Sequence, residues 1–176
     1  MALRPTPDAL REQAFAVLQA ELPGAVFLDL FAGSGVVSAE ALSRGAARVI
    51  LVEPDPRARQ LIARNFALLG VAPDAFQILG VPADRALEVL AKRGFVADLA
   101  WADPPFAAFS QHIPTLARLA TLGLLRPGGG LVVECPPKEE LVLQGFAVER
   151  VLRGAVLLRF CPAAEFAEAS AVSNRG

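Results

Sequence analysis

Residues 25–35, AVFLDLFAGSG, decide the fold of this chain. The apolar run from Ala25 to Asp29 predicts a short buried strand, and a glycine-rich turn from Phe31 to Gly35 follows it directly. A helix is expected next, from about Val36 to Arg44, and Gly45 predicts its end. A buried strand, a tight turn and a helix in this order are typical of an α/β protein.

Apolar and amphipathic segments alternate in the same way along the rest of the chain. Further strands are expected at residues 48–53, 76–79, 97–103 and 131–135. Further helices are expected at about residues 9–21, 56–69, 84–92 and 113–122. A closing hairpin around Arg153-Gly154 is predicted from segments 146–152 and 155–160. This order predicts a mostly parallel sheet with helices on both faces.

The length of 176 residues suits one domain, which we expect to span residues 1–161. Residues 162–176 are small and polar and predict a flexible tail. Pro, Gly or charged residues interrupt every apolar run well short of the ~20 residues that a membrane span needs. The first residues lack the apolar segment of a signal peptide, so we expect a cytoplasmic protein without membrane contact.

Acidic and basic side chains nearly balance, with 17 Lys and Arg against 18 Asp and Glu. Strong binding to naked nucleic acid relies on excess positive charge, so the composition disfavours it while leaving room for a local basic patch. Cys135, Cys161 and the single histidine, His112, lack the spacing of metal ligands, so no metal is expected. Both thiols are expected to be buried or half-buried, and His112 to be a solvated loop residue.

Acidic residues stand at or near the ends of four consecutive predicted strands: Asp29, Glu53, Asp84 and Asp103. In a parallel α/β sheet, ligands bind at the carboxyl ends of the strands. These four side chains are therefore the candidate functional residues, and for Glu53 the alternative is a solvated acid at a strand end.

The glycine-rich turn itself (Phe31, Gly33, Ser34, Gly35) would let the backbone pass close beneath a ligand. A dinucleotide-binding turn would have glycine at position 38, where this chain has Ser38. A carboxylate beside the turn, Asp29, would repel a phosphate and suits a positively charged ligand. The amino group and sulfonium of S-adenosylmethionine carry such charge.

Two more acids fit parts of the same ligand. Glu53, at the tip of the second expected strand, can accept hydrogen bonds from both ribose hydroxyls. Asp84, after the third expected strand, can accept a hydrogen bond from an adenine amino group.

The sharpest signal is Asp103-Pro104-Pro105-Phe106, after the fourth expected strand. Consecutive prolines force a stiff extended corner, from which the Asp103 carboxylate and the Pro104 carbonyl can project as hydrogen-bond acceptors. Two acceptors on an aromatic amine localise its lone pair and prepare it for methylation. Phe106 offers a flat face for stacking a base. The competing interpretation is a proline-capped strand with Phe106 in the core.

Together these segments resemble the class I S-adenosylmethionine-dependent amino-methyltransferases. In particular the chain is similar to the RsmD-type 16S ribosomal RNA guanine-N2 methyltransferases. The segment from Arg4 to Glu12, the stretch Glu40-Ala-Leu-Ser-Arg-Gly-Ala46 and the hairpin at Arg153-Gly154 fit the same family. The resemblance covers roughly residues 3–160.

The resemblance implies a Rossmann-like, seven-stranded, mostly parallel sheet with an antiparallel last strand. It implies S-adenosyl-L-methionine as cofactor and a guanine amino group of 16S rRNA, in the small ribosomal subunit, as the target. Candidate substrate contacts are Arg4, Thr6 and Arg11, with Arg153 near the same opening. Since few arginines gather there, an assembled small subunit is the expected substrate rather than free RNA.

Three other functions are compatible with parts of the sequence. A DNA adenine-N6 methyltransferase would use the same Asp103 corner, although 176 residues leave little room for a target-recognition region. A nicotinamide-dependent oxidoreductase would share the fold but not Ser38 or the Asp103 corner. A non-catalytic cofactor-binding module would bind the ligand without turnover.

Overall fold

The structure, a computed structural model, describes residues 7–137 and 139–162. Seven strands of this part form one sheet in the order β3-β2-β1-β4-β5-β7-β6. The strands are β1 Val26–Asp29, β2 Arg48–Val52, β3 Phe76–Leu79, β4 Ala97–Ala102, β5 Leu125–Glu134, β6 Phe146–Leu152 and β7 Ala155–Phe160. Strands β1 to β5 pair in parallel, and β7 is antiparallel to β5 and β6. The predicted sheet with an antiparallel last strand is confirmed.

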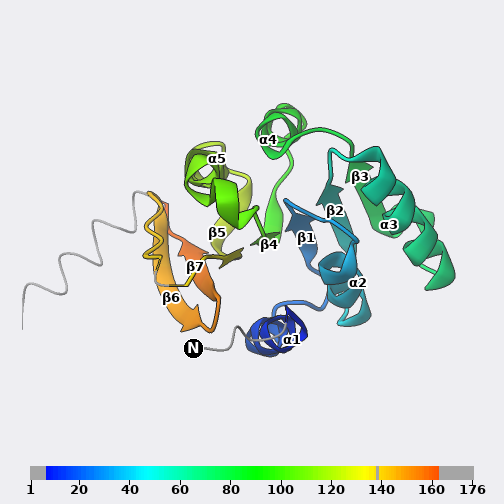
Figure 1. Cartoon of the computed structure of the whole chain (residues 1–176), viewed down its shortest axis with the longest axis horizontal. Helices are drawn as coiled ribbons and strands as arrows, with labels where there is room; N and C mark the ends of the chain where they lie inside the picture. The colour runs from blue at the N-terminus through cyan, green and yellow to red at the C-terminus, as the bar shows by residue number, and fades with distance from the viewer. Residues whose placement is uncertain (1–6, 138, 163–176) are drawn as a thin grey trace, which may run out of the picture.

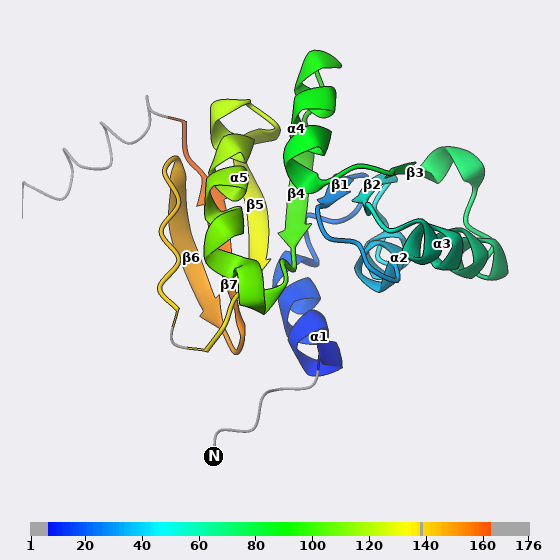
Figure 2. The same ribbon diagram turned by 45° about the horizontal axis from the view of Figure 1, so that its top comes forward.

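Helices cover both faces of the sheet (Figure 1). They are α1 Pro7–Leu18, α2 Val36–Ser43, α3 Pro56–Leu68, α4 Ala83–Lys92 and α5 Phe109–Thr121, with short 3-10 turns η1 Pro73–Ala75 and η2 Phe106–Ala108. One core cluster joins α4 and α5 to the sheet, and the other joins α1, α2 and α3 to the opposite face. Figure 2 shows the β6–β7 hairpin at one edge and β3 with α3 at the other.

An aromatic stack fixes α1 against the sheet. The ring of Phe15 lies 5.5 Å from that of Trp101 on β4 and 6.1 Å from that of Phe27 on β1. All three side chains are completely buried. Stacked aromatic pairs add to the stabilisation from apolar burial, so α1 is tied to the two central strands.

Two predicted boundaries were wrong. Helix α5 begins at Phe109 rather than near residue 113, because the buried side chain of Phe109 packs into the core and adds a turn; Pro114 therefore lies inside the helix. Strand β5 begins at Leu125 rather than at Leu131 and includes the expected glycine loop. Its pairing with β4 shifts register there, from Ala97↔Leu125 to Leu99↔Gly130.

Glycine is required at this irregularity. A Cβ at Gly129 would lie 2.8 Å from the carbonyl oxygen of Arg126 and 2.9 Å from that of Asp98. Only a residue without a side chain lets the backbones approach so closely, so a glycine-rich stretch typical of a loop forms part of a strand.

Some expectations fall on residues outside this description. Arg4, Thr6 and all but Pro162 of the expected tail lie there. The predicted first helix, residues 9–21, is observed as α1, which starts at Pro7 and ends at Leu18. Within residues 7–137 and 139–162, no helix is long and apolar enough to cross a membrane.

Candidate active site

Three acidic residues meet at the carboxyl edge of the sheet. Asp29 is the last residue of β1, and Glu53 and Asp103 directly follow β2 and β4. Because β1 pairs in parallel with both neighbours, these three strand ends are adjacent. Their charges interact, since the carboxylates of Asp103 and Glu53 both help to raise the pKa of Asp29. The structure therefore brings these predicted site residues together.

Asp29 lies beneath the glycine turn and is 1% exposed. Its Oδ2 accepts a 2.8 Å hydrogen bond from the hydroxyl of Ser38, in the first turn of α2. Burial raises the pKa of Asp29 to about 7, although the bonds from Ser38 and from the Phe31 backbone oppose the shift. The carboxyl group is thus poised between its neutral and charged forms near neutral pH.

Glu53 fastens the glycine turn to the tip of β2. Its Oε2 accepts a 2.9 Å hydrogen bond from the Gly33 amide, and its Oε1 accepts a 2.8 Å bond from the Asp55 amide. The side chain is 9% exposed. A carboxylate offers about four acceptor positions, so these two bonds orient the group without exhausting its accepting capacity.

The two glycines of the turn have different surroundings. Gly33 has a φ of +53°, and a Cβ built there would have no atom within 4 Å. Gly35 has a φ of +79°, and its Cβ would lie 3.2 Å from Ile62 and 3.3 Å from Phe66. Gly33 therefore borders open space, while Gly35 allows α2 and α3 to pack closely.

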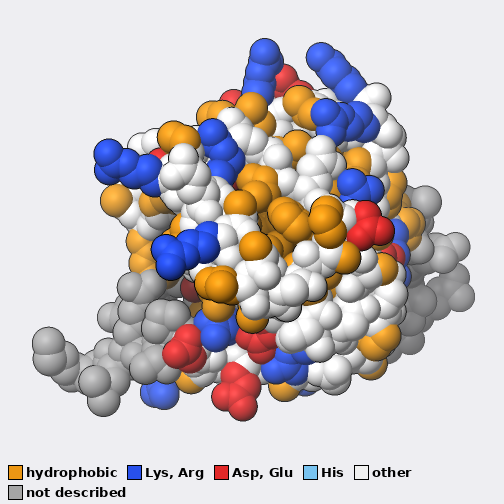
Figure 3. All heavy atoms as spheres, turned by 90° about the vertical axis from the view of Figure 1, so that its right-hand side faces the viewer, with side chains coloured by type: hydrophobic (Ala, Val, Ile, Leu, Met, Phe, Trp, Pro, Cys, Tyr) orange, Lys and Arg blue, Asp and Glu red, His pale blue; other side chains and the backbone are white. Residues whose placement is uncertain are grey.

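A small hollow reaches the turn from the α3 side. It has a volume of about 270 Å³ and is lined by Ser34, Gly35, Val36, Ala39, Asn65, Phe66, Leu68 and Leu69. Figure 3 views the molecule from this side and shows apolar side chains gathered near the middle of the view. None of these lining residues comes from β4 or from the Asp103 corner, so this hollow is separate from the β4 side of the turn.

The Asp103 corner, residues 103–105, lies between β4 and η2 and belongs to no helix or strand, and the extended form expected of Asp103 and Pro104 stays a prediction. Asp103 and Pro105 are exposed, Pro104 is buried, and Phe106 is half-buried at the start of η2. Pro105 has φ −54° and ψ 124°. The competing prediction, with Phe106 in the core, does not describe this arrangement.

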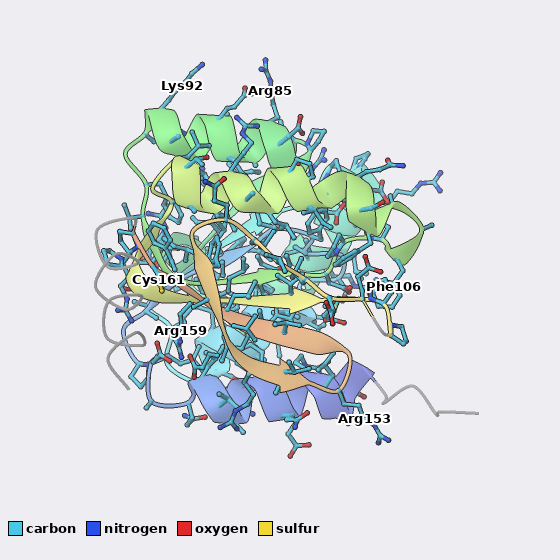
Figure 4. The ribbon with its side chains drawn as sticks, turned by 90° about the vertical axis from the view of Figure 1, so that its left-hand side faces the viewer. Arg85, Lys92, Phe106, Arg153, Arg159 and Cys161 are labelled. Atoms are coloured by element: carbon cyan, nitrogen blue, oxygen red, sulfur yellow. The ribbon has the colours of Figure 1, made fainter. Side chains whose placement is uncertain are left out.

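The β6–β7 turn lies at the same edge as this corner. The Cys135 amide, directly after β5, donates a 3.0 Å hydrogen bond to the carbonyl oxygen of Gly154. Figure 4 shows Arg153 and Phe106 toward the same end of the sheet, with Arg159 and Cys161 away from it. Arg153 therefore lies toward the same end of the sheet as Phe106, and its contact with substrate stays a prediction.

Phe31 and His112 contact each other beside the turn. Their ring centroids are 5.0 Å apart, with an edge-on angle of 70°. His112 lies in α5 and is half-buried, so its prediction as a solvated loop residue was wrong. Helix α5 starts earlier than expected and therefore includes His112. The contact with Phe31 then accounts for the partial burial of the histidine.

Asp84 and Arg11, two further predicted site residues, are not among the three acids that meet at the strand ends. Asp84 is exposed in the first turn of α4, next along the edge after β3. The guanidinium of Arg11 bonds to Glu40 on α2 at 2.6 Å and to Asp8 at 3.0 Å. That pairing gives Arg11 a clear role in joining α1 to α2, and its contact with substrate stays a prediction.

The cysteines match their expectation, since Cys135 is buried and Cys161 is half-buried. Sequence reasoning missed two residues of this site. Ser38 was considered only as a departure from a dinucleotide motif, and Glu134 was treated as an ordinary strand residue. Glu134 accepts a 3.2 Å hydrogen bond from the Trp101 indole, and no sequence signal marks it, because only the register with β4 places it beside Asp103.

Comparison with known proteins identifies the family of this chain. The family described as "Conserved hypothetical protein 95" matches residues 1–155. The chain belongs to this family. The "Putative rRNA methyltransferase YlbH" of Bacillus subtilis (strain 168) is 39% identical over 139 residues, which cover 78% of this chain and 74% of YlbH.

Two further proteins are similar to this member of the family. The "Ribosomal RNA small subunit methyltransferase D" of Escherichia coli (strain K12) is 38% identical over 104 residues, 59% of this chain and half of that relative's length. A solved structure, "Putative methyltransferase yhhF from Escherichia coli", has a TM-score of 0.74 and 29% identity, covering 92% of this chain and 89% of the other. The fold is that of the class I methyltransferases.

The contrast between the two glycines gives a stability prediction. Both Gly33→Ala and Gly35→Ala place a side chain at positive φ, which costs ~1–2 kcal/mol. Gly35→Ala should lose a further ~1–3 kcal/mol of unfolding free energy because its Cβ crowds Ile62 and Phe66. Urea denaturation of the two variants measures the difference, and equal losses would contradict the packing role of Gly35.

The raised pKa of Asp29 predicts a pH-dependent stability. Because the folded-state pKa of about 7 exceeds the ordinary 3.8, the folded protein holds this proton more tightly. Its contribution is fully present below the ordinary pKa and is lost as pH rises through 7. Between pH 4 and pH 8, wild type should therefore lose ~2–4 kcal/mol more unfolding free energy than Asp29→Asn, at ~1.4 kcal/mol per pKa unit.

Denaturant titrations at several pH values provide this measurement. Asp74→Asn, which removes an exposed carboxylate, is the matched control and should follow the wild-type curve. Parallel curves for wild type and Asp29→Asn would show that the buried carboxyl group does not titrate in this range.

Proposed function

We propose that this chain is a cytoplasmic S-adenosylmethionine-dependent methyltransferase that modifies the N2 amino group of a guanine in 16S rRNA. The observation that carries the proposal is the meeting of Asp29, Glu53 and Asp103 around an open-sided glycine turn. Membership of the family supports it, as do the names of the relatives from B. subtilis and E. coli.

The residues of this edge fit S-adenosylmethionine. The open space above Gly33 admits a ligand close to the backbone, and the buried carboxyl of Asp29 lies beneath it. A positive charge above the turn would favour the ionised form of Asp29. Glu53, already oriented by two amides, would hold the ribose hydroxyls, and Asp84 the adenine amino group. When bound, this cofactor would supply an electrophilic methyl group, whose bond to sulfur breaks with the electron pair left on the departing neutral thioether.

Asp103 and Pro104 prepare the amine that receives the methyl group. The exposed Asp103 carboxylate and the Pro104 carbonyl would accept its two hydrogens and draw the lone pair out of the aromatic ring. Once the nitrogen has gained a methyl group it is acidic, and one proton leaves along the hydrogen bond to Asp103 or to water. Positioning of this kind contributes up to ~7–11 kcal/mol to a reaction barrier. Phe106 would stack on the base.

The proposed substrate rests on the names of relatives and on the net charge of the chain. The E. coli relative is named as a small-subunit rRNA methyltransferase, and guanine N2 is the target that the family resemblance implies. The net charge is −1, so phosphate attraction alone would capture bare RNA weakly. We therefore propose a base displayed on an assembled, or partly assembled, small subunit as the substrate.

Glu53→Ala should weaken S-adenosylmethionine binding by about 1.5–3 kcal/mol, the scale of lost charge-assisted hydrogen bonds. The reason is that Glu53 would hold the ribose and also orients the Gly33 amide. Isothermal titration calorimetry measures the change. Glu88→Ala, which removes a carboxylate on α4, should bind as wild type does, and unchanged affinity of Glu53→Ala would refute the ribose role.

Asp103→Ala should lower kcat by on the order of 10²–10⁴-fold while cofactor affinity stays within a few-fold. An interaction made mainly in the transition state affects turnover rather than binding. Single-turnover methyl transfer and calorimetry on the same preparation separate the two effects. A near-wild-type rate would show that the corner is structural.

The substrate itself can be tested with particles from cells that lack the enzyme. Tritiated methyl transfer should be faster to intact small subunits than to protein-free 16S rRNA, because ribosomal proteins supply contacts that this chain lacks. Mass-spectrometric mapping of the labelled nucleotide should find N2-methylguanosine. Equal or faster labelling of free RNA at physiological salt would refute the preference, and label on another base would refute the guanine assignment.

A further inference from the structure

A second carboxylate lies beside the Asp103 corner. Strands β4 and β5 pair in parallel with Ala102 opposite Val133, and the next residue on each strand is acidic: Asp103 and Glu134. Parallel pairing therefore places Glu134 at the neighbouring strand end on the same edge of the sheet. Glu134 is half-buried, whereas Asp103 is exposed.

The Glu134 side chain is oriented by a hydrogen bond from Trp101. The indole Nε1 of Trp101 donates a 3.2 Å hydrogen bond to its Oε1. Trp101 is completely buried, and its ring stacks on Phe15 at 5.5 Å with an interplanar angle of 16°. The backbone just after Glu134 is fixed by the bond from Cys135 to Gly154. A carboxylate anchored in this way is pre-organised, so it would lose little conformational entropy on binding a ligand.

The chemistry of guanine supplies a partner for such a group. Beside the N2 amine, guanine carries an N1–H donor, whereas adenine has a bare acceptor nitrogen at N1. Asp103 and the Pro104 carbonyl account for the two N2 hydrogens, which leaves N1–H for an adjacent acceptor. A carboxylate offers about four acceptor positions, so Glu134 can accept a bond from N1–H in addition to bonds that it already makes, such as that from Trp101.

We propose that Glu134 accepts a hydrogen bond from N1–H of the target base and selects guanine over bases that lack this donor. The inference rests on the proposed function and adds a specificity-determining residue to it. A base with an acceptor at N1 would bring a lone pair against the carboxylate, and unmatched polar groups of this kind give strong discrimination.

The test compares two small-subunit substrates that differ at one nucleotide. Splinted ligation places either guanosine or 2-aminopurine riboside at the mapped methylation position of 16S rRNA before reconstitution. 2-Aminopurine keeps the reactive amine but has an acceptor at N1. Each enzyme's ratio of kcat/KM for the two particles is measured, and the change in this ratio between variants cancels the intrinsic reactivity of the two bases.

Glu134→Gln is the informative variant, because its amide oxygen can still accept the bond from Trp101 while its amide nitrogen donates. Wild type should prefer guanine, and Glu134→Gln should lower this preference at least tenfold with cofactor affinity within twofold. Glu139→Gln, an exposed acid in the following loop, is the control and should keep the wild-type ratio.

Three other outcomes would overturn the inference. If Glu134→Gln keeps the wild-type ratio, whether its rate is normal or uniformly reduced, Glu134 does not read N1 and the inference alone fails. If wild type labels neither particle, the proposed function fails and the inference with it. Should Glu134→Gln not fold, Trp101→Phe loosens Glu134 without removing its charge; it should lower the guanine preference, and an unchanged ratio would equally refute the role.

Discussion

The burial of one carboxyl group, Asp29, beside two further acids at the same edge of the sheet is the constraint on which the site depends. Parallel strands β1, β2 and β4 end side by side, so Asp29, Glu53 and Asp103 cannot be far apart. The cost falls mainly on Asp29, because it is buried, and its pKa rises to about 7 as a result. A cation placed over the turn would offset the free-energy cost of both burial and repulsion. A positively charged ligand would therefore stabilise the ionised form of Asp29.

Neutral donors, rather than cations, hold the two inner carboxylates. Ser38 bonds to Asp29, and the amides of Gly33 and Asp55 bond to Glu53. Several arginines are instead paired with acids elsewhere on the molecule, including Arg11 with Glu40, Arg118 with Glu88 and Arg159 with Glu21. Three acidic side chains gather at the strand ends, and their negative charge would favour a cationic cofactor and disfavour RNA phosphates.

Much of this arrangement could be predicted from the sequence, because its causes are local. A buried strand, a glycine turn and a helix recur in order, and the acids stand at the strand ends. The start of α5 could not be predicted, since it depends on where Phe109 packs in the core. The glycines of β5 are typical of a loop, and only the approach of two carbonyl groups explains their place in a strand.

Side-chain roles that depend on register were the harder part. Arg11 stands in a segment expected to face substrate, yet its partner Glu40 is 29 residues away and on another helix. Glu134 is inconspicuous in an apolar strand until pairing with β4 puts it beside Asp103. Asp29 and Asp103 have the same chemistry in the sequence, and burial separates them. The carboxyl group of Asp29 is buried, whereas that of Asp103 is in contact with solvent. In the function that we propose, this difference in environment would let two identical side chains take different roles, one toward the cofactor and one toward the substrate.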